Sequence, residues 1–226
     1  MMSPRIWKSA VFAVVLALVA TGCSFTTTET ARQLDHGEQV YSGSADFPGF
    51  LYLPRLNVAG KFGLGGAGDL GAHVGTNFMT YNAGVAGRVY PGDYAIIGLQ
   101  TNTMFFPAGT EIMGTDVGGD NLLTTITPRV MTAVQEDGPP VYGGMQSTIF
   151  ISFGEDVDGV EYDFAAIGPL FGFDHVTDSN IGIQIELILM PIGIGPEGEF
   201  AAFGQGEEAF MPFQISLGGY FRHKME

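Results

Sequence analysis

From about residue 40 onward, apolar side chains alternate with small or polar ones along the chain. Alternation with a period of two places the apolar residues on one face of a β-strand. No stretch shows the i, i+3, i+4, i+7 apolar spacing of an amphipathic helix. The alternation is clearest in residues 69–78, 81–90, 181–189 and 213–222. The pattern therefore predicts an all-β fold.

Weaker strand signals fill the intervals between these segments, in residues 50–62, 94–105, 122–135, 146–153 and 160–171. Turn-forming sequences such as Pro91-Gly92-Asp93 separate them. The segments predict eight to ten strands joined mostly as consecutive hairpins. An antiparallel up-and-down β-barrel fits this order, because closure removes the exposed strand edges of an open sheet. We expect one barrel domain spanning residues 40–226.

Composition bears on the direction in which the apolar face of the barrel points. Charged residues make up 15% of the chain, below the ~25% of typical soluble domains. The opposite face of the best strands holds mainly glycine and uncharged polar residues, with single charges such as Arg88 and Glu186. Such a face suits the lumen of a membrane barrel, so we expect the apolar side chains to contact lipid. The alternative is a lipid-tethered, soluble, lipocalin-like barrel that binds a small apolar ligand inside.

Aromatic residues near the strand ends favour the membrane barrel weakly, because such residues form interfacial girdles. The candidates for these girdles are Phe78, Tyr81, Tyr90, Tyr94, Phe105, Phe106, Phe213 and Phe221.

The N-terminal segment has the organisation of an export signal. Arg5 and Lys8 precede an uninterrupted apolar run from Ala10 to Ala20, which is too short for a membrane-spanning helix of ~20 residues. The run leads into Val19-Ala20-Thr21-Gly22-Cys23. This sequence resembles the lipobox of bacterial lipoproteins, with Ala20 where the family prefers leucine.

The lipobox resemblance implies that residues 1–22 are a lipoprotein signal peptide and that Cys23 becomes an acylated N-terminus. It also implies that outer-membrane lipid is the partner of this chain through acylated Cys23. Ser24 after the cysteine implies sorting to the outer membrane of a Gram-negative cell. Residues 23–39 are polar at first and lack a hydrophobic period, so we expect a flexible tether there.

Two glycine-rich stretches and the C-terminus carry a second resemblance. Residues 63–75 and 84–90 look like the early hairpins of outer-membrane β-barrel proteins, and Ile215–Phe221 resembles their closing strand, which usually ends on an aromatic residue. Here five further residues follow Phe221. This resemblance implies a membrane barrel and identifies no catalytic residue.

Charge and cysteine content exclude other classes. With 9 basic and 24 acidic residues, the formal net charge is −15, which argues against a nucleic-acid partner. A single cysteine permits no intramolecular disulfide.

We expect no metal, cofactor or catalytic residue. His73 lies on the polar face with Asp69 and could be a metal ligand or a proton acceptor, but a lumen histidine bonded to a neighbour is the preferred interpretation. No serine lies in a G-x-S-x-G motif, and residues 63–71 lack the lysine of a phosphate-binding loop. Weaker candidates are serines 147, 152 and 216, and the acidic residues Glu155, Asp156, Asp158, Glu161, Asp163, Asp116 and Asp120, whose spacing differs from an EF-hand.

These observations predict a non-enzymatic barrel with a structural, surface or small-solute role. An enzyme acting on lipid would require a histidine to converge with serine or aspartate at the barrel rim.

Overall fold

The computed structural model describes residues 30–48, 54–77, 80–105, 111–112, 115–116, 122–154, 159–196, 198, 200–202 and 213–224. The expected signal peptide, Cys23 and the first part of the expected tether lie outside these residues. The described part is all-β. It contains no helix with the length and apolarity that a bilayer crossing requires.

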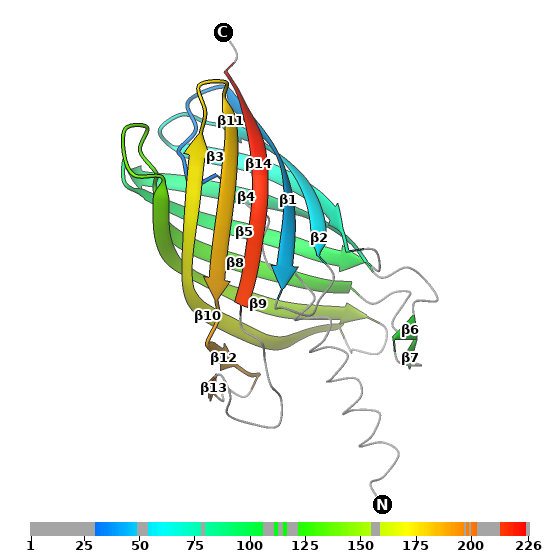
Figure 1. Ribbon diagram of the computed structural model, residues 1–226. Coiled ribbons are helices and arrows are strands. Elements are labelled where there is room, and N and C mark those ends of the chain that lie inside the picture. Colours follow the sequence, from blue (N-terminus) through cyan, green and yellow to red (C-terminus); the bar gives the residue numbers. More distant parts are fainter. Residues whose placement is uncertain are drawn as a thin grey trace, which may run out of the picture.

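Ten long strands form a closed antiparallel barrel (Figure 1). Each strand pairs with the next long strand along the chain, and the last pairs with the first from Glu38↔Lys224 to Pro48↔Gln214. The predicted up-and-down barrel is therefore confirmed. The strands are β1 (Glu38–Pro48), β2 (Arg55–Gly63), β3 (Gly68–Thr76), β4 (Tyr81–Gly92), β5 (Ala95–Phe105), β8 (Leu122–Thr132), β9 (Val141–Gly154), β10 (Gly159–Val176), β11 (Ile181–Leu189) and β14 (Phe213–Lys224).

The two ends of the barrel differ. Brief turns join β2 to β3, β4 to β5, β8 to β9 and β10 to β11 at the end where β14 finishes, which we call the short-turn end (Figure 1). The opposite end, the long-loop end, carries the two longest connections, from β5 to β8 and from β11 to β14. There β12 (Ile192–Ile194) pairs with β10 and with β13 (Phe200–Ala202), and β6 (Glu111–Ile112) pairs with β7 (Thr115–Asp116).

The alternation seen in the sequence becomes an alternation between the outside and the inside of the barrel. In β11, Ile181, Ile183 and Ile185 are 45–53% exposed, whereas Gln184 and Glu186 are at most 1% exposed. The same arrangement recurs around the barrel, with Val58, Val74 and Val85 outside and polar partners inside. The apolar face therefore points outward, as predicted.

Of the aromatic residues proposed for the girdles, four have the outward placement that a girdle needs. Tyr81, Tyr94, Phe105 and Phe221 are exposed near strand ends. The prediction for Tyr90 is wrong, because its position in the alternation of β4 turns it into the lumen, where it is 8% exposed. Phe213 is half-buried, and residues 78 and 106 lie outside the described residues.

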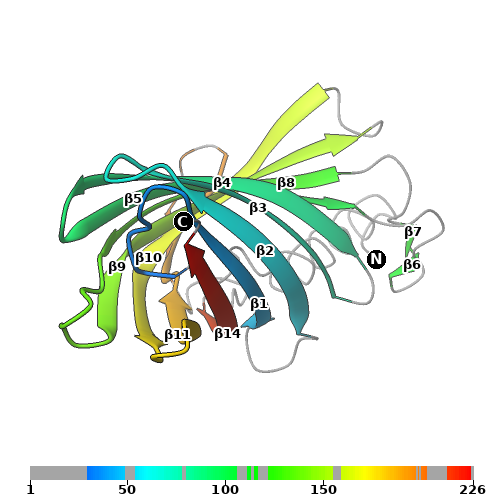
Figure 2. The ribbon, with the colours of Figure 1, turned by 90° about the horizontal axis from the view of Figure 1, so that it is seen from above.

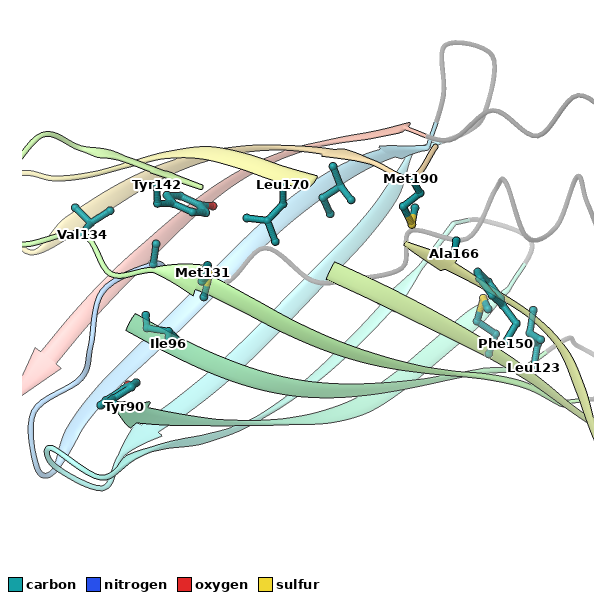
Figure 3. Packing of buried hydrophobic residues seen from close by; sticks show 13 residues of the cluster. Tyr90, Ile96, Leu123, Met131, Val134, Tyr142, Phe150, Ala166, Leu170 and Met190 are labelled. Carbon is teal, nitrogen blue, oxygen red and sulfur yellow. The ribbon is translucent and has the colours of Figure 1, made fainter. Parts of the chain in front are cut away.

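The interior is not uniformly polar. One connected apolar cluster runs along the inner face from β4 to β11, and Phe150, Ala166 and Leu170 within it are fully buried (Figure 3). Ile188 and Met190 join it from the end of β11. The opposite wall, formed by β14, β1, β2 and β3, carries mostly polar side chains into the lumen.

Candidate functional site: the lumen and its plug

The lumen holds charged side chains in opposite pairs. Each of its five described, buried carboxylates lies within 4 Å of an arginine. An isolated buried charge costs several kcal/mol, so pairing is the condition under which these side chains can face inward. The pairs are Glu38–Arg222, Asp46–Arg55, Asp69–Arg88, Asp174–Arg32 and Glu186–Arg129.

A network of polar side chains surrounds Glu186 in the lumen. Arg129 on β8 lies 3.3 Å from the Glu186 carboxylate and donates a 2.8 Å hydrogen bond to Gln146. The Tyr142 hydroxyl donates to Glu186 at 2.9 Å and accepts from Gln184 at 2.7 Å. Because these residues come from three strands, the network ties β8, β9 and β11 together across the lumen.

An amide-rich group lies nearer the long-loop end. Asn57 donates to Asp46, and Asn82 donates to Asn102 at 3.0 Å. His73 is 3% exposed and its Nε2 lies 3.1 Å from the Asn102 side-chain oxygen. His73 therefore lies in the lumen bonded to neighbours, as expected.

Residues 30–37 cross the short-turn end of the barrel on the inside, and we call this segment the plug (Figure 2). Thr30, Ala31 and Leu34 are at most 3% exposed. The structure differs from the flexible tether expected for residues 23–39. Residues 38–39 already belong to β1, and the plug is packed against the wall. Hydrogen bonds to inward polar groups explain why these residues are ordered despite their lack of a hydrophobic period.

Asp174 on β10 holds the first part of the plug. Its carboxylate accepts hydrogen bonds from the Ala31 main-chain N–H at 2.6 Å and from the Thr30 hydroxyl at 2.7 Å. The Tyr220 hydroxyl on β14 also donates to this carboxylate. Arg32 lies 3.6 Å away and balances the charge.

Arg88 and Tyr90 on β4 hold the plug from another side. Arg88 donates to both oxygens of Asp69, at 2.9 and 2.8 Å, and also to the main-chain carbonyls of Thr30 and Arg32. The Tyr90 hydroxyl donates to Asp69 and accepts from the Leu34 N–H at 3.0 Å. The plug is thus bound mainly through its backbone.

The outer edge of the plug is tied to the rim. The Gly37 N–H donates to the Gly63 carbonyl at 3.0 Å, and Val134 donates to the Ala31 carbonyl at 2.9 Å. Lys224 donates a 2.8 Å hydrogen bond to Asp35, and this bond lowers the pKa of that exposed carboxyl. Contacts therefore reach the plug from several sides of the mouth.

Other predicted residues are not brought together into a site. Ser147 and Ser152 are half-buried on β9, and Ser216 is buried and accepts a hydrogen bond from Gln214 at 2.7 Å. Side chains of the acidic residues 155, 156, 158, 161, 163, 116 and 120 lie outside what the structure describes. Among the described residues, no three His, Cys, Asp or Glu side chains gather as a metal site would need.

The plug is the feature that sequence reasoning missed. Its Ala31-Arg32-Gln33-Leu34 stretch shows no period, because different parts of the barrel wall take up its side chains. The one signal in the sequence is Leu34, an apolar residue within a polar stretch.

No family model and no curated protein matches the chain. Among solved structures, it is similar to the outer membrane protein OprG from Pseudomonas aeruginosa, with 11% identity, coverage of 87% of this chain and 100% of that one, and a TM-score of 0.34. It is also similar to the translocator domain of the autotransporter NalP from Neisseria meningitidis, with 11% identity, 96% coverage of both chains and a TM-score of 0.35. Both TM-scores are low, and neither likeness supports a statement about function.

Proposed function

We propose that this chain is a non-enzymatic β-barrel lipoprotein of the bacterial outer membrane with a small-solute role. In this proposal the barrel spans the bilayer, and the acyl chains on Cys23 add a second attachment to outer-membrane lipid. The signal peptide, residues 1–22, is removed before the barrel is assembled.

The observation that carries the proposal is the inverted barrel wall, whose outer face is apolar and whose inner face holds the buried charged side chains together with one apolar cluster. Each of the ten barrel strands carries exposed apolar side chains, although β1 has few of them. Nine residues, the length of β2, β3 and β11, rise about 23 Å at a tilt of ~40°. This height is close to the ~25 Å apolar band of outer-membrane barrels.

The soluble, lipocalin-like alternative requires the reverse arrangement. In the structure, the side chains of Ile183 and Val58 are 53% and 60% exposed on the outer face, whereas Glu186 and Arg129 are buried inside. If the barrel were soluble, these apolar side chains would contact water and these charged side chains would be removed from it. Both features are unfavourable in water, because folding there is driven mainly by the burial of apolar surface. The geometry therefore favours the membrane barrel.

The small-solute role is supported by the chemistry of the lumen. Its described carboxylates each have an arginine partner, and many of its other buried polar side chains are amides and hydroxyls such as Gln100, Asn102 and Thr127. These three side chains are at most 2% exposed, so the lumen is filled by its own groups. In this proposal a neutral polar solute enters by exchanging its hydrogen bonds with those of the lumen amides and hydroxyls.

A Cys23→Ser variant expressed with its own signal separates the two candidates. We expect it to lose incorporation of labelled palmitate, to remain in the membrane after an alkaline wash, and to migrate faster on gels before heating than after it. The intact chain is the control. Recovery of the folded variant in the soluble periplasmic fraction would overturn the membrane barrel, and retained palmitate would overturn acylation at Cys23.

A further inference from the structure

We infer that the short-turn mouth is a peptide-binding site, occupied in cis by residues 30–37, and that this occupancy closes the lumen at that end. The inference rests on the proposed function, because a closed mouth matters for a barrel that admits solutes. The ligand class is a short peptide, bent as residues 31–32 are, with a small residue, a cation and an apolar residue in the order Ala31, Arg32, Leu34.

Main-chain recognition is the first step. Asp174 accepts the Ala31 N–H, Arg88 donates to the Thr30 and Arg32 carbonyls, and Tyr90 accepts the Leu34 N–H. These groups come from strands on different sides of the mouth, β10 and β4, and each binds a main-chain N–H or carbonyl of the bent segment. Backbone hydrogen bonds provide affinity, and pockets for side chains provide selectivity.

The selective contacts are those of three side chains. Ala31 is fully buried, so a larger residue does not fit there without displacement. Leu34 packs with Val40 and Tyr220 in a small apolar cluster. The Arg32 guanidinium lies 3.6 Å from Asp174 with 9% of its side chain exposed.

The wall groups that hold the plug keep hydrogen-bond partners of their own, although Asp174 loses Arg32, the cation that balances its charge. Arg88 keeps a bidentate partner in Asp69, and Asp174 keeps the Tyr220 hydroxyl, both from the barrel wall. The barrel is therefore expected to persist when the plug leaves. In this respect the plug differs from a segment that the barrel needs in order to fold.

Gly63 offers a specific way to displace the plug. A Cβ atom at this position would lie 2.1 Å from the Asp35 main-chain oxygen and 2.9 Å from the Leu34 Cβ. Alanine at Gly60, on the same strand, would meet its nearest atom at 3.9 Å. The Gly63→Ala and Gly60→Ala variants therefore form a matched pair.

The test uses the full mature chain with Cys23→Ser, reconstituted in planar lipid bilayers. We expect low conductance from this parent and from Gly60→Ala. Conductance should rise in Gly63→Ala and in a variant lacking residues 30–36. A synthetic peptide of residues 30–37, added on the short-turn side, should block the deletion variant, whereas a scrambled peptide should not.

Binding of the same peptide, fluorescently labelled, to the detergent-solubilised deletion variant gives a readout that does not need a membrane. Asp174→Asn in that variant should weaken binding on the order of tenfold, because a charge-assisted hydrogen bond is lost. Equal binding of the scrambled peptide would overturn the peptide site. A deletion variant that inserts as a heat-modifiable barrel yet conducts like the parent would overturn closure by the plug.

Two outcomes separate this inference from the proposed function. If the parent does not insert into bilayers but the deletion variant binds the peptide specifically, the membrane role fails and the site stands. If the deletion variant does not fold, Gly63→Ala decides: a conductance equal to that of Gly60→Ala contradicts the inference.

Discussion

At the residue scale, glycine makes room for the inward tyrosines that bind the lumen carboxylates. Tyr220 lies over Gly182, its direct partner across β14 and β11, and Tyr142 lies over Gly172 in the same way. A Cβ at either glycine would fall 2.0–2.1 Å from the opposing ring. Gly172 and Gly182 on the inward face are thus counterparts of specific aromatic side chains, which the alternation alone does not reveal.

A Gly182→Ala substitution should displace the Tyr220 ring and break its hydrogen bond to Asp174. We expect a loss of about 1–3 kcal/mol in the free energy of unfolding, the usual cost of overpacking. Urea titration followed by the heat-modifiable gel shift measures it. Gly43→Ala, whose Cβ would have its nearest neighbour at 3.9 Å, is the control, and equal midpoints for both variants would contradict the explanation.

The buried pair Arg129–Glu186 permits a second test at this scale. Glu186→Gln leaves Arg129 charged and without its carboxylate in the lumen, for which we expect a loss of about 3–5 kcal/mol. Asp35→Asn breaks the exposed pair with Lys224 and should cost about 0–1 kcal/mol. The same urea titration compares the free energies of unfolding of the two variants. Similar losses in both would mean that the Arg129–Glu186 pair is well solvated.

At the scale of the element, the strength of the outward apolar face decides which strands sequence reasoning finds. β11 carries isoleucine or leucine at each outward position, and its predicted bounds agree with those of the structure. β1 was missed, because its outward positions include Gly43 and Ala45 and its inward ones Ser42 and Ser44. The barrel, its hairpin order and the direction of its faces could be predicted, since they follow from alternation and turns.

Contacts between distant segments could not be predicted in this way. Asp69 and Arg88 face each other in the β3–β4 hairpin, so their pairing follows once the hairpin is known. Asp174 and Arg32 are 142 positions apart and meet through barrel closure. The plug depends on such contacts, and for that reason the sequence of residues 30–37 alone indicates a tether.

The outward face of β11 gives a prediction for an element as a whole. Ile185→Lys places a charge in the middle of the proposed lipid-facing band and should destabilise the barrel by about 2–4 kcal/mol. Ile181→Lys lies at the strand end and should cost about 0–1 kcal/mol. Urea unfolding in lipid vesicles distinguishes them. A soluble barrel would tolerate both lysines equally, because both positions are exposed.

At the scale of the whole molecule, the negative net charge comes mainly from acidic residues in the turns and loops, because the described carboxylates of the lumen are paired with arginines. Each described lumen carboxylate has an arginine, whereas Asp93, Glu136 and Asp178 lie in turns at the short-turn end. The chain's net charge of −15 is therefore compatible with a lumen that is close to neutral. The cost of removing a carboxylate from water keeps these acidic turns out of the bilayer.

The unequal ends of the barrel predict its orientation. Outer-membrane barrels place short turns in the periplasm and longer loops outside, so the plug should face the periplasm. In a Cys23→Ser background, Asp137→Cys lies in the β8–β9 turn at the short-turn end, and Phe200→Cys lies on exposed β13 at the other end. A membrane-impermeant maleimide should label Phe200→Cys on whole cells and reach Asp137→Cys after the outer membrane is permeabilised. The reverse labelling would place the plug at the cell surface, where a periplasmic peptide could not compete for its site.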